Sequence, residues 1–438
     1  MMGGGTNRAN STIPRAKRQQ CSGEGVVFDT STVFGSGSYV SEPSGAKAGQ
    51  VIFTTANWFA AISTDGGVTF NMIDPTVYAG PAVAATDAGF CCDQVVQYLP
   101  SIDRFVWLIL YTPNDKSVNR FRLVTFHPSD VDTSGINSWI YLDIVSTDIN
   151  FSSYLDFPDL AVGNNQLYVS ITDHNTGFAV IRVPIADLDV AGSLTYYYTN
   201  KNDATFAQFS HATQNPLDTL YWSGHYVLGT TMRIFQWPES STSYTWISLD
   251  INDWPSDVSN FVSNCPGGDS NSTTNWLFQP AFADIIGATR RSTDEVWFAW
   301  AAPSGGGFPN PHVQVVQIGV GNWPNLQLVK QWQVWNPDFA FAYPALYTND
   351  CGDVGLAVAF GGGSFSPSGA LGVVDSDGVL TQTVYYPELS NVCEDRFGDY
   401  FTVRSGIGSG YVGFVYTEQS TGDGGAQGNP RFVEFARG

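Results

Sequence analysis

Positive charge is scarce in this 438-residue sequence. It has 19 lysine and arginine residues against 40 aspartate and glutamate residues, which gives a formal net charge of −21 at pH 7. Nucleic-acid binding needs clustered basic side chains that neutralise phosphates, so this balance argues against DNA or RNA as a partner. It does not exclude an anionic sugar, because a few arginines in a cleft can override the mean field locally.

Several other features are missing. No apolar run reaches the roughly 20 residues that cross a membrane, and helical periodicity is nearly absent. There is no serine nucleophile elbow, phosphate-binding loop, H-E-x-x-H motif or EF-hand loop, and the absence of C-x-x-C argues against a zinc ribbon. Residues 1–20 lack the apolar segment of a signal peptide, and their basic, Gly- and Asn-rich composition predicts a disordered tail.

The residues that are abundant suit an extracellular all-β protein. Hydrophobic residues make up 43%, aromatic residues 14% and charged residues only 13%, with 45 glycines. The six cysteines fit up to three disulfides in an oxidising compartment. Because side chains alternate along a strand, we expect adjacent Cys91 and Cys92 to have different partners. N-glycosylation sequons at Asn10, Asn150 and Asn271 also favour a secreted glycoprotein.

Short β-type runs recur along the chain, separated by Gly, Pro, Asn and Asp. The repeat length is about 50 to 70 residues, which fits four-stranded propeller blades with extended loops. The repeats predict that residues 21–438 form one seven-bladed β-propeller, with six blades as the second choice. A strand near residues 26–29 would close the ring. The alternative is a pair of β-sandwich domains, against which the regular repetition and the lack of a linker argue.

One turn carries a family resemblance. Residues 63–70, STDGGVTF, lie between two β-type runs, and their Asp and Gly predict a hairpin turn. The stretch resembles the Asp-box of sialidase-like β-propellers, with Phe70 where tryptophan is usual. The resemblance implies a fold-stabilising turn on the face opposite the ligand. Asp65 would accept hydrogen bonds from nearby backbone N–H groups, and Thr69 and Phe70 would anchor the next strand.

The sialidase active site is not expected to accompany that turn. Sialidases surround a carboxylate with three arginines, and members of the family usually carry an F-R-I-P-like stretch near the N-terminus, which is missing here. Arg104, Arg290 and Arg291 map to the far face. We therefore do not expect true sialidase activity.

Candidate site residues lie where the innermost strands begin and at neighbouring loops, because these positions face the usual ligand side of a propeller. Histidine transfers protons near neutral pH, arginine holds carboxylates, and tyrosine or aspartate can act on a sugar. The predicted catalytic residues are His211, His225, Arg396, Asp399 and Tyr400. The predicted substrate-binding residues are Asp93, Asp159, His174, Gln279, His312 and Tyr343. No metal site is predicted among them.

Two function classes stay open. The first is a carbohydrate-active enzyme on a polysaccharide or glycoconjugate, either a polysaccharide lyase or a glycoside hydrolase using a carboxylate pair. The second is a non-catalytic lectin or protein-interaction propeller. Trp58, Trp222 and Tyr343 would stack on sugar rings if they are exposed. The cofactor is unknown; acidic stretches at residues 250–257 and 350–353 offer oxygen ligands of the kind structural calcium prefers. We expect a secreted monomer.

Overall fold

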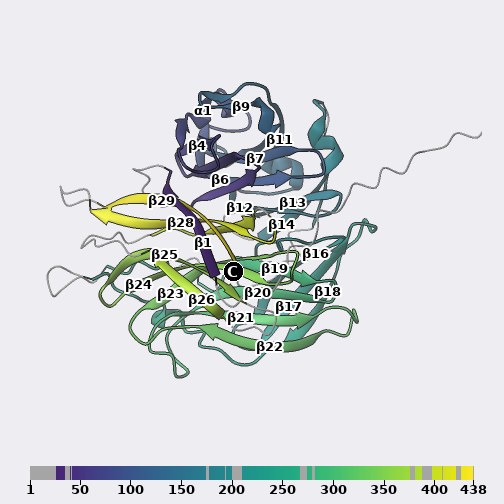
Figure 1. The fold of residues 1–438 in the computed structure, drawn as a ribbon. Helices are drawn as coiled ribbons and strands as arrows, with labels where there is room; N and C mark the ends of the chain where they lie inside the picture. The colour runs from purple at the N-terminus through teal and green to yellow at the C-terminus, as the bar shows by residue number, and fades with distance from the viewer. Residues whose placement is uncertain are drawn as a thin grey trace, which may run out of the picture.

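The computed structural model describes residues 26–34, 40, 42–173, 177–192, 194–199, 210–266, 274–278, 282–374, 380–386, 397–406, 408–420 and 426–437. Seven sheets of three or four antiparallel strands form the blades of a β-propeller, and a two-stranded sheet lies beside the second blade (Figure 1). No helix in these ranges is long and apolar enough to span a membrane.

The first four blades follow the chain in order. Blade 1 contains β2 (Ser44–Ala48), β3 (Val51–Ala56), β4 (Phe59–Ser63) and β5 (Asn71–Ile73), followed by the helix α1 (Pro75–Ala79). Blade 2 contains β6 (Phe90–Leu99), β7 (Arg104–Tyr111), β8 (Arg120–Phe126) and β11 (Ile140–Val145), with the small pair β9 (Val131–Asp132) and β10 (Gly135–Ile136). Blade 3 contains β12 (Leu155–Val162), β13 (Gln166–Asp173), β14 (Gly177–Pro184) and β15 (Tyr197–Tyr198). Blade 4 contains β16 (Thr219–Val227), β17 (Thr231–Pro238) and β18 (Thr245–Asp250).

The remaining three blades complete the ring. Blade 5 contains β19 (Gly287–Ser292), β20 (Glu295–Ala302), β21 (His312–Gly319) and β22 (Gln327–Val334). Blade 6 contains β23 (Ala340–Thr348), β24 (Val354–Gly362), β25 (Phe365–Val374) and β26 (Leu380–Tyr386). Blade 7 contains β27 (Thr402–Ser405), β28 (Tyr411–Ser420), β29 (Ala426–Arg437) and, as its outermost strand, β1 (Val26–Val33).

The pairing of the two ends of the chain closes the ring. In Figure 1 the purple β1 lies alongside the yellow β29, and the register runs from Val26 opposite Arg437 to Val33 opposite Arg431. Pairing with β1 covers the edge of β29, which would otherwise be the exposed outer edge of blade 7. The predicted seven blades and the closing N-terminal strand are confirmed, and the two-sandwich alternative is wrong.

The innermost position of blade 4 is occupied by the short segment 210–214. The backbone N–H of Thr213 donates to the carbonyl of Tyr221 in β16, and parallel bridges join Ser210 to Ile285 and Gln214 to Thr289. Adjacent innermost segments therefore run in the same direction around the axis. Their first residues meet at one mouth of the channel, here called the entry mouth, and their last residues meet at the opposite mouth.

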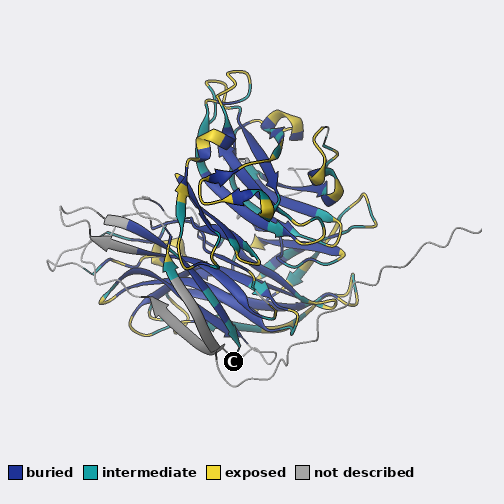
Figure 2. Ribbon diagram, turned by 45° about the horizontal axis from the view of Figure 1, so that its top comes forward, coloured by how far each residue is buried: buried dark blue, intermediate teal, exposed yellow. Residues whose placement is uncertain are grey.

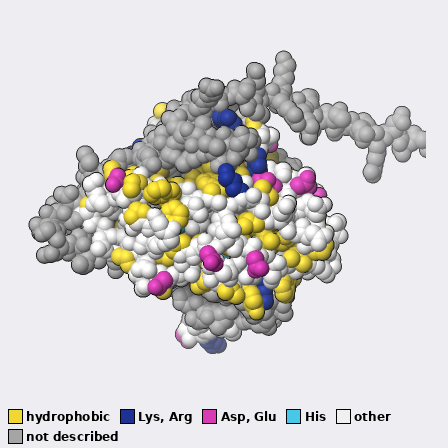
Figure 3. All heavy atoms as spheres, turned by 90° about the horizontal axis from the view of Figure 1, so that it is seen from below, with side chains coloured by type: hydrophobic (Ala, Val, Ile, Leu, Met, Phe, Trp, Pro, Cys, Tyr) yellow, Lys and Arg dark blue, Asp and Glu magenta, His cyan; other side chains and the backbone are white. Residues whose placement is uncertain are grey.

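Apolar side chains fill the spaces between blades. Strands of the blades are dark blue in Figure 2 and the yellow exposed positions gather in connecting loops. In β7, every residue from Phe105 to Tyr111 is buried, because both faces of a blade pack against neighbouring blades. On the surface drawn in Figure 3, acidic side chains stand apart among uncharged groups, so uncharged polar groups supply much of this surface.

The turn between β4 and β5 has the contacts expected of it. The Oδ1 atom of Asp65 accepts from the backbone N–H groups of Val68 and Thr69 at 3.1 and 3.0 Å. Gly66 and Gly67 have φ of 78° and 97°, which glycine adopts without strain. The N–H of Gly66 donates to the carbonyl of Gln50, in the turn that follows β2. The turn is thus at the opposite mouth's face, away from the entry mouth.

Asp65→Asn should lower the thermal stability of the fold at neutral pH. It should also remove the dependence of stability on pH that the carboxylate of this turn contributes. Hydrogen bonds from the side chain and backbone of Thr69, and then from Ser63, lower the pKa of Asp65 to about 2. A lowered folded-state pKa means that the carboxylate stabilises the fold above its unfolded pKa near 4 and loses this effect as pH falls towards 2. We expect a lower Tm at pH 7 and a smaller difference from wild type at pH 2. An equal difference at both pH values would contradict this account.

Candidate functional site

A polar network occupies the centre of the channel. Asp159 of β12 accepts from Nη2 of Arg404 in β27 at 3.1 Å and from Nε2 of Gln214 at 3.0 Å. Gln97 of β6 donates in turn to Gln214 at 2.9 Å, and Nδ1 of His211 lies 3.7 Å from Asp159. These residues come from four different blades, so the network ties the inner strands together across the axis.

This network closes the channel, and we refer to it as the plug. The space bounded by Asp159, His211, Gln214, Tyr400 and Arg404 has a volume of about 10 Å³. That is about the volume a single water needs, so a ligand cannot pass from one mouth to the other. A ligand in the described part of the channel would therefore lie on one side of this network or on the other.

Acidic groups gather around Tyr400 on the entry side of this plug. Burial is the main cause that raises the pKa of Tyr400 well above its usual value, and the charges of Asp93, Glu42, Asp159 and Asp399 raise it further. The phenol therefore stays protonated at neutral pH. Tyr400 also packs close to His211 and Phe157, with ring centroids 6.3 and 5.9 Å from its own.

A cavity of about 330 Å³ opens beside these carboxylates at the entry mouth, between blades 1, 2 and 3. Three carboxylates line it, from Glu42, Asp93 and Asp156, and Trp58 stands at its rim with 53% of its surface exposed. Other lining residues include Asn57, Cys91, Cys92, Tyr111, Asn119 and Tyr154. We refer to this space as the entry cavity.

The expectation that Cys91 and Cys92 bond to different partners is wrong. They form a disulfide with each other, with a Cα–Cα distance of 3.7 Å. The alternation argument assumed a regular strand, but the pairing of β6 with β7 is irregular between Phe90 and Gln94, which frees the local backbone. Cys265 and Cys351 are also disulfide-bonded.

The structure brings five of the predicted site residues together in the plug and directly beside it. Asp159 and His211 belong to the central network, and Asp93, Asp399 and Tyr400 lie next to it. Burial lowers the pKa of His211, and the charge of Asp159 only partly opposes this effect. At 3% exposure, His211 is a buried neutral ring rather than one that meets solvent.

Two other predicted histidines lie within blades 4 and 5 instead. His225 is fully buried, with its ring centroid 5.1 Å from Trp254 and 4.7 Å from Trp300. His312 stacks on Phe308 at 4.1 Å and is also fully buried. Neither is among the residues that line the entry cavity.

Tyr343 is 2% exposed, and its hydroxyl accepts a hydrogen bond from the backbone N–H of Phe278. It therefore links β23 to the segment before blade 5 and does not face a ligand. Trp222 is likewise buried, so of the three aromatics expected to stack on sugars only Trp58 is exposed. The predicted residues Arg396, His174 and Gln279 lie outside the described residues.

His225→Leu should make folding stability less dependent on pH. Burial lowers the pKa of His225 to about 3, whereas an unfolded histidine titrates near 6.5. Between these values the unfolded chain binds one more proton, so stability at this site is full above pH 6.5 and falls towards pH 3. Removing the ring should reduce the slope by up to ~1.4 kcal/mol per pH unit. Denaturant unfolding from pH 4 to 7 measures this slope. An unaltered slope in His225→Leu would contradict the argument.

Sequence reasoning missed Glu42, Asn57 and Arg404. Glu42 lies in the loop before β2, and Asn57 lies in the turn between β3 and β4; neither stretch contains a recognisable motif. Arg404 lies in the middle of β27, and nothing in its local sequence shows that its side chain turns inward to Asp159. Only the three-dimensional assembly of blades 3 and 7 puts these two charges together.

The acidic stretches considered for calcium are engaged in other ways. Asp250 accepts from Thr231, Asp257 caps a short helical turn, and Asp353 pairs with Arg437 at 3.1 Å. In the part of the chain that the structure describes, no group of three or more His, Cys, Asp or Glu side chains is arranged to hold a metal ion.

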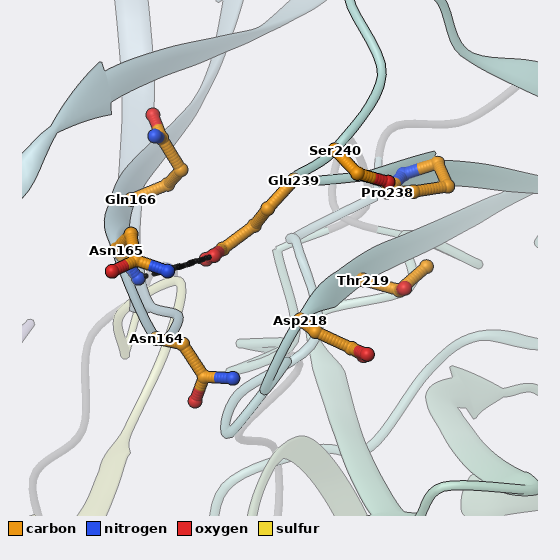
Figure 4. A pocket seen from close by; sticks show the side chains of 8 residues that line it. All are labelled: Asn164, Asn165, Gln166, Asp218, Thr219, Pro238, Glu239 and Ser240. Carbon is orange, nitrogen blue, oxygen red and sulfur yellow. Dashed lines mark hydrogen bonds between the residues drawn. The ribbon is translucent and has the colours of Figure 1, made fainter.

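Two further cavities lie towards the opposite mouth. One of about 630 Å³ is bordered by the ends of inner strands, including Lys47, Tyr98, Tyr347 and Arg404. The other, about 390 Å³, lies between blades 3 and 4 (Figure 4), where the Glu239 carboxylate accepts from the backbone and side chain of Asn165 at 2.9 to 3.2 Å. Neither collects carboxylates and an exposed tryptophan as the entry cavity does.

Comparison with known proteins gives a fold likeness only. No protein-family profile and no curated protein sequence matches the chain. Among solved structures, the intramolecular trans-sialidase from Ruminococcus gnavus in complex with oseltamivir carboxylate is 10% identical, over 74% of this chain and 90% of that one, with a TM-score of 0.41. The alpha-L-arabinanase of Penicillium chrysogenum complexed with arabinobiose is 11% identical, over 94% and 98%, also at 0.41. The AfRom2 CNH domain is 11% identical, over 93% and 99%, at 0.39.

Sialidases are thus among the matched structures, as the resemblance of residues 63–70 predicted. At these identities and TM-scores, no site residue is transferred from them to this chain.

Proposed function

We propose that the protein is a glycoside hydrolase that cleaves an uncharged glycan in the entry cavity. The observation that carries this proposal is the meeting of Glu42, Asp93 and Asp156 in one cavity with the exposed ring of Trp58. Carboxylates supply acid–base chemistry and bind sugar hydroxyls, while an aromatic face binds the C–H face of a sugar.

Asp93 and Asp156 are the pair that we assign to the reaction. They come from β6 and β12, the innermost strands of adjacent blades, so they approach the cavity from different sides. Glycoside hydrolysis needs one carboxylic acid to protonate the leaving oxygen and one carboxylate to act on the anomeric carbon directly or through water. Asp93 is 7% exposed and Asp156 is more exposed, which favours Asp93 as the acid and Asp156 as the base or nucleophile.

Hydrolysis fits the site better than a lyase reaction. A lyase base must reach the substrate and accept its proton near neutral pH. Tyr400 stays protonated mainly because burial raises its pKa, and His211 is enclosed in the plug. The described residues that line the entry cavity include acids but no lysine or arginine, which favours an uncharged sugar over a uronate.

Extracellular action is part of the proposal. Disulfide bonds favour an oxidising compartment. Cys91 is bonded to Cys92, and Cys265 and Cys351 are each disulfide-bonded as well. The sequon residue Asn150 is exposed, as a glycosylation acceptor must be.

The test is digestion of a glycan panel by the purified protein, with and without EDTA. New reducing ends without ultraviolet absorbance, unchanged by EDTA, are expected on uncharged glycans. Rising absorbance from unsaturated uronates would instead indicate a lyase. Retention on a glycan array without cleavage of any glycan would favour a lectin and overturn the hydrolase proposal.

A further inference from the structure

The wall of the entry cavity has a chemical character that the proposed carboxylate chemistry does not use. Trp58, in the turn between β3 and β4, packs edge-on against Phe90 with ring centroids 6.5 Å apart. Phe90 directly precedes Cys91 and Cys92, both partly exposed and both lining the cavity. The indole ring and the disulfide thus line the same cavity, with Phe90 packed against the indole beside the first cysteine, and they give this part of its wall an apolar character.

The disulfide gives this wall a fixed shape. Bonding between neighbouring residues joins the two sulfur atoms into a small closed ring with the intervening peptide, whose Cα atoms are 3.7 Å apart. Sulfur is polarizable and forms good contacts with apolar surfaces. Cys92 also packs against the apolar core of blades 2 and 3, which fixes the position of the disulfide.

A polar group with no partner lies next to this wall. Asn57 lines the cavity with only 4% of its surface exposed, and within the described part of the chain no group donates to its Oδ1 atom. A buried polar atom without a partner is costly, so it marks a position where a ligand donor is expected. A sugar hydroxyl is such a donor.

We propose that the entry cavity is a subsite for a single terminal, uncharged pyranose. The sugar ring is held between Trp58 and the Cys91–Cys92 disulfide, and one of its hydroxyl groups donates a hydrogen bond to Oδ1 of Asn57. The C–H groups of the ring contact the apolar wall and the hydroxyls face Asn57 and the carboxylates. The volume of about 330 Å³ is near the lower end of small-molecule sites, which suits one terminal unit rather than a long chain. This inference deepens the proposed function and rests on it for the location of cleavage.

The experiment uses the full chain and measures both binding and cleavage. Isothermal titration calorimetry with a panel of uncharged monosaccharides is applied to wild type, Trp58→Ala, Asn57→Ala and the double variant Cys91→Ala/Cys92→Ala. Trp246→Ala is the matched control, because Trp246 is 42% exposed on the outer strand of blade 4. The Tm of each variant shows whether it folds; Trp58 is exposed, so its replacement tests the proposal even if the cysteine variant does not fold.

We expect wild type and Trp246→Ala to bind the same monosaccharide equally. Trp58→Ala and the double cysteine variant should each bind it about tenfold more weakly, the size of one aromatic or sulfur contact. In the cleavage assay the same changes should raise KM more than they lower kcat. Wild-type binding that both variants retain would overturn the subsite, and would leave the hydrolase proposal standing if glycan is still cleaved. The lack of any monosaccharide binding by wild type would also overturn it.

Discussion

Asp93→Asn should lower kcat for glycan cleavage by a factor of ~10²–10⁴, the usual contribution of general acid–base catalysis. The amide keeps the shape of the side chain but can neither donate the proton that the leaving oxygen needs nor carry its charge. Asp156→Asn should have an effect in the same range, because it removes the partner carboxylate. Initial rates of reducing-end formation on the glycan identified by the panel provide the measurement.

The control for this prediction is Asp253→Asn. Asp253 is exposed in the loop after β18 and does not line the entry cavity, so its replacement removes the same charge without touching the site. Its rate should equal that of wild type. If Asp93→Asn and Asp156→Asn both fold and retain more than a tenth of the wild-type kcat, these carboxylates do not perform the reaction.

Arg404→Met should destabilise the whole propeller by ~3–5 kcal/mol, the cost of leaving a buried charge without its partner. The Arg404 side chain is 6% exposed and that of Asp159 is 13% exposed, so solvent cannot replace the lost contact at 3.1 Å. Because the pair links blade 3 to blade 7, the loss should be seen as a single earlier transition in denaturant unfolding.

The double variant Asp159→Asn/Arg404→Met distinguishes an unpaired charge from lost packing. It removes both charges, and replacing both members of a buried pair is often close to neutral. It should therefore be more stable than Arg404→Met alone, which gives a coupling free energy between the two sites. A double variant that is less stable than the single one would show that side-chain packing, rather than charge, is the main contribution of Arg404.

The architecture could be predicted from sequence because each blade repeats a local signal. Alternating β-type runs with Gly, Asn and Asp between them determine strands and turns within a few residues, and the turn at Asp65 has the predicted contacts. The closing strand could be predicted by counting, since the last repeat was one strand short. These features depend on neighbours in sequence.

The site depends on contacts between distant segments and was predicted only in part. The rule that inner strands begin at one mouth of the channel predicted that Asp93, Asp159 and Tyr400 lie near one another, and they do; their roles stay a prediction. It could not show that His225 is enclosed by Trp254 and Trp300, since burial comes from the packing of blades 4 and 5. Likewise, only an irregular strand permits the disulfide between adjacent cysteines.

The most direct test of the account is a crystal structure of Asp156→Asn with an uncharged oligosaccharide that the wild-type protein cleaves. The account predicts the terminal ring at the entry cavity, against Trp58 and the Cys91–Cys92 disulfide, with its glycosidic oxygen within hydrogen-bond distance of Asp93. A sugar bound instead in the 630 Å³ cavity at the opposite mouth, beside Tyr98 and Tyr347, would contradict it.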